Sequence, residues 1–106
     1  MELVMLYSTW PDEGSASACA EALIAQRLAA CVTVIPAAQS HYCWEGEREW
    51  TREHPMLVKT SKDRAQAARD LIVAMHPYDL ASVIGFTVNS EISHAPYLDW
   101  AFASTR

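Results

Sequence analysis

Basic residues are scarce in this sequence. Eight Lys and Arg stand against thirteen Asp and Glu, which gives a formal net charge of −5. A surface that binds DNA or RNA needs clustered positive charge, whereas these eight residues are scattered among the acidic ones. Long apolar runs are also missing, because none reaches the roughly 20 residues that span a bilayer. We therefore expect neither a nucleic acid nor a membrane as a partner.

Cysteine and glycine are also few, with three of each. Cys19, Cys31 and Cys43 are odd in number and lack CxxC spacing, so we expect neither a disulfide framework nor a structural zinc site. The chain begins with a strand-like segment and has no signal region, which indicates a cytoplasmic protein with reduced thiols. No Gly-rich phosphate loop, HExxH or Ser-His-Asp order occurs, so the sequence does not indicate an enzyme.

Apolar residues, in contrast, are plentiful and regularly spaced. They make up 51% of the 106 residues, so we expect residues 1–106 to form a single small domain. The patterns predict strands at 3–8, 31–35, 40–44, 48–58 and 84–88, and helices that begin near residues 16, 61 and 93. We expect inward-facing residues in the first two helices at Ala16, Ala20, Leu23, Ile24 and Leu28, and at Ala65, Ala68, Leu71, Ile72 and Met75.

Two prolines fall within the predicted strands. Pro36 should bend the second strand, which then resumes through Trp44. Pro55 cannot donate to a sheet ladder, so we expect a bulge or a local break in the third strand.

This order of elements predicts an α+β fold, the ferredoxin-like βαββαβ sandwich with an added C-terminal helix. If the bent strand is counted once, the antiparallel sheet should have the strand order 4-1-3-2, with both long helices on one face. The other face then needs a cover, and the simplest cover is another copy of the chain.

Two short segments combine an aromatic residue with a turn former. Trp44 precedes the turn Glu45-Gly46-Glu47, where Gly46 can adopt the positive φ of a tight hairpin. His76-Pro77-Tyr78 follows a helical run, and Pro77 moves His76 out of the helical region. Taken alone, both segments are more simply explained by a purely structural role.

Five motifs in order resemble the CutA family of divalent-cation tolerance proteins. They are Leu28-Ala29-Ala30-Cys31-Val32 with Ile35-Pro36; Ser40, Tyr42, Trp44 and Gly46 of the hairpin; Lys59-Thr60; His76-Pro77-Tyr78; and Tyr97-Leu98 with Trp100. The resemblance implies a ferredoxin-like homotrimer similar to the PII signalling proteins, whose hairpins pack across subunits through residues such as Tyr42, Trp44 and Trp50. It also implies a link to copper and other divalent cations, with no cofactor required.

The sequence departs from the family after His76-Pro77-Tyr78. The acid is kept as Asp79, but the usual proline and glutamate are missing from the segment Asp79–Val83. A ligand role for that glutamate therefore does not transfer. In the hairpin, Cys43 replaces a second tyrosine and His41 replaces an aliphatic residue.

Four side chains are candidate ligands for a soft cation, namely Cys31, His41, Cys43 and His76, because thiolate and imidazole suit copper. Each of the four also has a structural interpretation. Cys31 would be a small buried apolar residue. His41 and Cys43, two apart on a strand, would face solvent or a subunit interface, and His76 would be a C-terminal helix residue favoured by the helix dipole. Since these positions are spread over the fold, we expect any closed site to be shared between subunits.

Three functions remain open. The first is a trimeric CutA-type protein that acts in metal tolerance, which the resemblance favours. The second is a PII-like sensor that binds a metabolite or nucleotide between subunits, with Lys59, Tyr78 and Asp79 as ligand-binding residues. The third is a small enzyme that uses His76 and Asp79.

Overall fold

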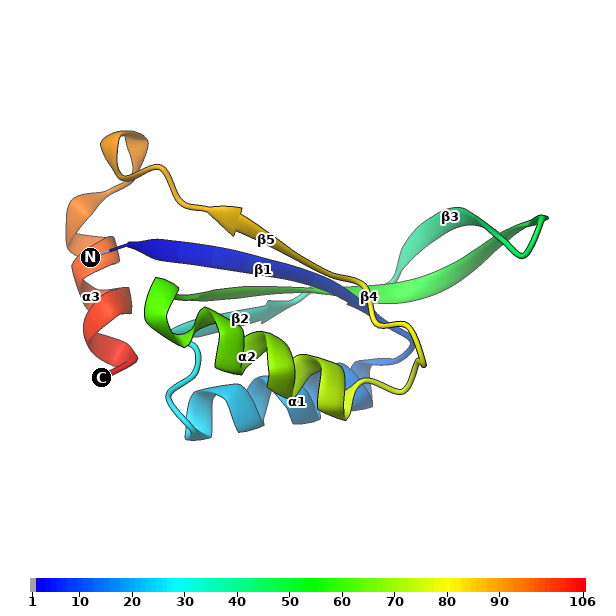
Figure 1. The fold of residues 1–106 in the computed structure, drawn as a ribbon, viewed down its shortest axis with the longest axis horizontal. Helices are drawn as coiled ribbons and strands as arrows, with labels where there is room; N and C mark the ends of the chain where they lie inside the picture. Colours follow the sequence, from blue (N-terminus) through cyan, green and yellow to red (C-terminus); the bar gives the residue numbers. More distant parts are fainter. Residues whose placement is uncertain (1) are drawn as a thin grey trace.

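The computed structural model describes residues 2–106 (Figure 1). Along these residues the elements are β1 (Leu3–Trp10), α1 (Glu13–Ala25), β2 (Cys31–Val34), β3 (Ala38–Trp44), β4 (Glu47–Ser61), α2 (Lys62–Met75), β5 (Val83–Thr87), the short 3-10 helix η1 (Ser90–Ile92) and α3 (Ala95–Ser104).

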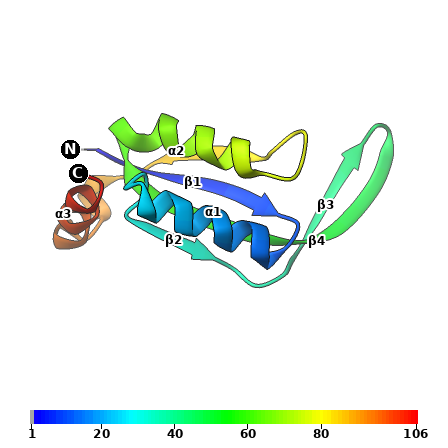
Figure 2. The ribbon, with the colours of Figure 1, turned by 90° about the horizontal axis from the view of Figure 1, so that it is seen from below.

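The strands form one antiparallel sheet in the order β2-β4-β1-β5, and β3 pairs with the outer part of β4. Because β2 and β3 together form the predicted bent strand, this order is the expected 4-1-3-2. Helices α1 and α2 lie side by side on one face of the sheet (Figure 2). The predicted ferredoxin-like α+β fold is therefore confirmed, with α3 at the end of the sheet where both termini lie (Figure 1).

The main core lies between this sheet and the two long helices. Strands β1 and β4 turn Leu6, Trp10, Met56 and Val58 toward the helices, and the helices contribute a second set of buried residues: Ala16, Cys19, Leu23, Ala68 and Ile72. Helix α1 is capped by Asp12, whose carboxylate accepts a hydrogen bond from the Ser15 amide at 2.7 Å, as expected for an N-cap.

Two predicted core positions are wrong. Ile24 is 46% exposed and Met75 is 37% exposed. In α1 the buried row passes through Leu23, and the next residue lies about 100° around the helix. Met75 is the last residue of α2, and the buried position there belongs to His76 instead.

The expected break at Pro55 is also wrong, because β4 runs without interruption from Glu47 to Ser61. The carbonyl of Pro55 accepts a hydrogen bond from the Ile35 amide at 2.8 Å. The N and O atoms of one strand residue point to the same side, so the missing N–H of Pro55 faces the gap where β2 ends and β3 has not begun. Pro55 thus sacrifices no ladder bond, and the bend falls at Pro36 as predicted.

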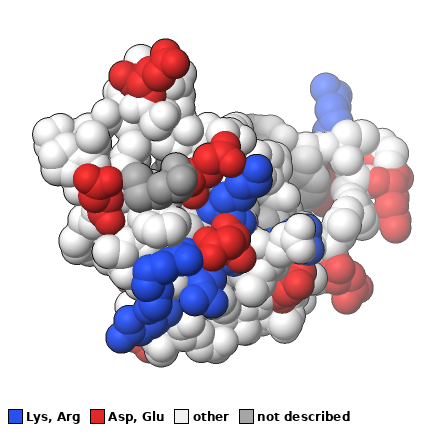
Figure 3. All heavy atoms as spheres, turned by 60° about the vertical axis from the view of Figure 1, so that its left-hand side comes forward, with Lys and Arg blue, Asp and Glu red and all other residues white. Residues whose placement is uncertain are grey.

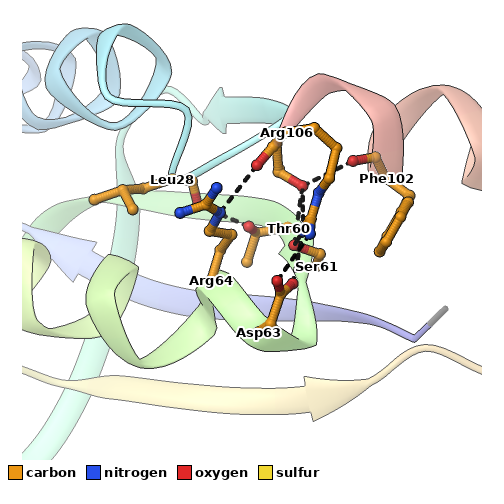
Figure 4. A network of polar contacts seen from close by, with 8 residues as sticks. Leu28, Thr60, Ser61, Asp63, Arg64, Phe102 and Arg106 are labelled. Carbon is orange, nitrogen blue, oxygen red and sulfur yellow. Dashed lines mark hydrogen bonds and ion pairs between the residues drawn. The ribbon is translucent and has the colours of Figure 1, made fainter.

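The C-terminal helix is attached by a polar network (Figure 4). The Arg106 guanidinium donates to both carboxylate oxygens of Asp63, at 2.8 and 2.7 Å, and to the Ser61 hydroxyl at 2.8 Å. Arg64 donates to the Thr105 carbonyl at 2.9 Å. On this side of the molecule, basic and acidic side chains lie next to one another (Figure 3).

Replacement of Asp63 by Asn should lower the melting temperature at pH 7. Hydrogen bonds from Arg106, and then from Ser61, hold the pKa of Asp63 well below its usual value of 3.8. A depressed carboxylate pKa stabilises the fold above the unfolded value, and this contribution is lost as pH falls toward the folded value. Thermal melts should therefore show a gap between wild type and Asp63→Asn that narrows below about pH 3.8. Asp70→Asn is the control, since Asp70 contacts only the neighbouring Arg69 in the same helix; a gap as wide at pH 2.5 as at pH 7 would contradict the assignment.

Candidate functional site

The β3–β4 hairpin projects beyond the rest of the fold (Figure 1). Trp44 pairs with Glu47 across a two-residue turn in which Glu45 has φ 51° and Gly46 has φ 82°. This is the pattern of a type I′ turn, so the prediction of a positive φ at Gly46 is confirmed. Trp44 is 50% and Trp50 is 55% exposed, which leaves large apolar surfaces on an arm that has no core of its own.

The His76-Pro77-Tyr78 corner is built around the imidazole of His76. Its Nε2 lies 2.8 Å from the Thr9 carbonyl and donates to it, while Nδ1 accepts from the Tyr78 amide at 3.1 Å. The ring lies between Trp10 and Tyr78, at centroid distances of 4.3 and 5.0 Å. Both nitrogens thus bind backbone groups, so His76 could coordinate a metal only by giving up one of these bonds. Asp79 is not one of its partners, and this removes the basis for a His76–Asp79 catalytic pair.

A groove of about 770 Å³ lies between the hairpin, this corner and the strand β1. Its lining consists of Tyr7, Thr9, Ser40, His41, Tyr42, Cys43, Trp44, Glu49, Glu53, Pro77, Tyr78, Asp79, Leu80 and Ser82. Two of the predicted ligand-binding residues, Tyr78 and Asp79, therefore share a concave site.

Glu53 is the residue of this groove that the sequence analysis missed. It is only 6% exposed, and the Tyr78 hydroxyl donates to its Oε2 at 3.1 Å. The alternation of side chains along a strand could have identified it. Residues two apart point to the same sheet face, so Glu53 lies on the same face as Pro55 and Leu57.

Two tyrosines of the groove, Tyr42 and Tyr78, have raised pKa values. Burial and then the hydrogen bond and charge of Glu53 raise the pKa of Tyr78 to about 12. Desolvation, followed by Glu49 and Glu53, raises the pKa of Tyr42. At neutral pH these groups are therefore hydroxyl donors beside carboxylates.

The remaining metal candidates lie in two places. His41 and Cys43 are exposed on one face of β3, and His41 Nε2 is 3.2 Å from Gln39 Oε1. Cys31 lies on β2, with the Lys59 Nζ 3.8 Å from its Sγ. Residues 2–106 contain no group of three or more His, Cys, Asp or Glu that could hold a metal ion. The thiol and imidazole donors fit a soft cation in kind, but they do not converge within one chain.

Lys59 is not in the groove with Tyr78. It lines a separate cavity of about 220 Å³ beside α3, where its Nζ lies 5.8 Å from the Tyr97 ring centroid. Lys59 lies six positions after Glu53 along β4, which corresponds to about 20 Å of strand. Lys59 and Tyr78 therefore lie in different cavities of a single chain, and the expectation that they serve one site between subunits stays a prediction.

The sheet face opposite the helices is apolar and open. Phe86 pairs with Met5 and Ile84 pairs with Tyr7, so these four side chains share that face. Phe86 is 54% and Ile84 is 52% exposed. Adjacent large apolar side chains with this exposure are typical of an interaction surface.

These features define a class: a ferredoxin-like α+β protein with one open sheet face and a long aromatic hairpin. A family model described as CutA1 divalent ion tolerance protein matches residues 4–104. The chain belongs to this family.

Individual relatives agree over nearly the whole length. The divalent-cation tolerance protein CutA of Pectobacterium atrosepticum is 37% identical over 105 residues, which cover 99% of this chain and 94% of that protein. The crystal structure of CutA from Xylella fastidiosa is 36% identical, with a TM-score of 0.92 over 100% of both chains. A structure from Archaeoglobus fulgidus, described as a periplasmic divalent cation tolerance protein CutA, is 30% identical, with a TM-score of 0.89 over 98% of this chain and 99% of its own.

Within residues 2–106, every helix is too short or too polar to cross a bilayer. The relatives carry the names of tolerance proteins rather than of enzymes.

Proposed function

We propose that this chain forms a homotrimer that acts in divalent-cation tolerance and binds copper or a similar cation at its subunit interfaces. The observation that carries the proposal is the open sheet face with Ile84 and Phe86, together with the exposed Trp44 and Trp50 on the hairpin. Membership in the CutA1 family supports the link to divalent cations.

Assembly through the open face would be driven by the burial of apolar surface. Burying a large apolar side chain stabilises by about 1.5–3 kcal/mol, and several such side chains lie side by side on this face. The hairpin, with Tyr42 42% exposed, can then lie over a neighbouring subunit. The number three comes from the family resemblance of the hairpin and corner motifs.

For the cation we propose thiol and imidazole ligands from Cys31, His41 and Cys43, completed across subunits. His76 belongs to this set only if it releases Thr9 or Tyr78, so we expect it to contribute little. Thiolate and imidazole favour copper over hard cations. Both must be deprotonated to bind, so affinity should fall below about pH 6.5.

Calorimetry with copper ions tests the ligand set. The variant Cys31→Ser, His41→Ala, Cys43→Ser should lose the measurable binding step while it remains folded and assembled. His76→Asn is the matched control, and we expect it to keep copper binding while it lowers the melting temperature. If the triple variant binds copper like the wild type, the ligands lie elsewhere.

The other hypotheses have less support. The groove at Tyr78 contains three acidic residues and neither Lys nor Arg, which disfavours a polyanionic nucleotide. We propose a cytoplasmic location, supported by three free cysteines that belong to no disulfide. The periplasmic description of the Archaeoglobus fulgidus relative is the opposing observation.

A further inference from the structure

The two residues that follow α3 are tied to the ends of both long helices. Arg27, just beyond the last turn of α1, donates from Nη1 to the backbone oxygen of Arg106 at 2.7 Å. Arg64, in the first turn of α2, donates to the Thr105 carbonyl at 2.9 Å (Figure 4). The Arg106 side chain in turn donates to Asp63. We refer to the contacts of Arg27, Arg64 and Arg106 as the latch.

Arg27 adopts a backbone conformation that normally favours glycine. Its φ is 56°, in the left-handed region. The Arg27 amide donates to the Ile24 carbonyl, and the Leu28 amide donates to the Leu23 carbonyl. These two bonds form the Schellman motif at the end of α1, in which glycine is the usual residue at the position of Arg27. A strained position is thus occupied by a residue whose side chain reaches Arg106, and this points to a role for that contact.

Helix α3 has few buried side chains of its own to hold it in place. Those among the described residues are Leu98 and Ala101, which pack with Leu3 and Ala30 in a small cluster separate from the main core. At the start of the helix, His94 forms no capping hydrogen bond through its side chain. An element with so few apolar contacts is expected to open at a lower free energy than the whole fold.

Helix α3 also closes one side of a cavity. The cavity of about 220 Å³ beside Lys59 is lined by Tyr97, Leu98 and Ala101 of α3, and by sheet residues that include Met5. The segment 89–94 before the helix is largely exposed, so it offers little resistance to a movement of α3. Such a movement would open this cavity.

We propose that α3 is a lid that opens as a unit about the segment 89–94, and that the latch keeps it closed. Opening exposes the cavity beside Lys59 together with Leu3 and Ala30, while the βαββαβ body stays folded. The proposal does not depend on the proposed cation site, because no latch residue belongs to that ligand set and the latch lies at the helix ends rather than on the hairpin.

Hydrogen exchange of the wild-type assembly, followed by mass spectrometry, tests the lid. Peptides from α3 should exchange faster than peptides from α1 and α2, and Arg27→Gly should accelerate α3 by about threefold or more. Glycine suits the left-handed position, so the end of α1 should exchange at the same rate or more slowly. Arg64→Met should also accelerate α3. Arg69→Met is the matched control and should leave α3 unchanged, since Arg69 contacts only Asp70.

Three results would overturn the proposal. The first is unchanged α3 exchange in Arg27→Gly, which would show that this contact does not hold the helix. The second is exchange of α3 in step with α1 in every variant, which would show that α3 opens only when the whole chain unfolds. The third is faster α3 exchange only in samples that have dissociated, as measured by light scattering on the same samples. The mass also reports on the proposed trimer, so failure of the lid is distinguishable from failure of the assembly.

Discussion

The substitution Phe86→Arg should convert the assembly into monomers. Phe86 lies on the open sheet face beside Ile84 and Met5, where more than half of its surface is uncovered in the single chain. In a trimer closed through this face, each copy would bury a guanidinium without a partner and lose about 1.5–3 kcal/mol of apolar burial. Three copies change at once, so the loss is repeated at every interface. Light scattering at micromolar concentration should give the mass of one chain.

Val73→Arg is the matched control for this substitution. Val73 is 51% exposed, close to the value for Phe86, but it lies on α2, which covers the other face of the sheet. The same added charge should leave the mass unchanged there. Dissociation by both variants, or by neither, would contradict an interface at the open face.

Trp10→Ala should cost about 3–5 kcal/mol in the free energy of unfolding. Trp10 is completely buried, and its indole N–H donates to the Ser8 hydroxyl at 2.9 Å. Its ring also supports the imidazole of His76, so its loss leaves both a cavity and a loosened corner. Chemical denaturation in the monomeric Phe86→Arg background measures the effect without a contribution from assembly.

Trp50→Ala is the control for Trp10→Ala, because it removes the same type of side chain from an exposed position. Trp50 is 55% exposed on the hairpin, so Trp50→Ala in that background should change the unfolding free energy by less than about 1 kcal/mol. Equal losses for the two tryptophans would show that Trp10 does not anchor the core.

The backbone architecture was predictable because local patterns and topology rules agreed. Alternating apolar residues marked the strands, Gly46 marked the hairpin turn and Pro77 marked the end of α2. Pro55 was misjudged because its effect depends on which side of β4 its missing N–H faces, and that side depends on where the neighbouring strand breaks.

The site was less predictable, because it depends on side chains that meet only after folding. The chain order gives no sign that Tyr78 would reach Glu53, 25 residues earlier, or that Lys59 would lie in a different cavity. His76 was a candidate metal ligand because the sequence cannot show that its Nε2 lies beside the Thr9 carbonyl and its Nδ1 beside the Tyr78 amide. Residue types in the sequence identified candidate ligands. The tertiary contacts determine which of these side chains are already engaged in hydrogen bonds.

The mass of the wild-type protein in solution tests the central claim most directly. Size-exclusion chromatography with multi-angle light scattering at micromolar concentration should give about three times the chain mass of 11.8 kDa. That result is expected if the open sheet face and the aromatic hairpin are covered by two further copies. A single species of 11.8 kDa would contradict the trimer and, with it, the cation site shared between subunits.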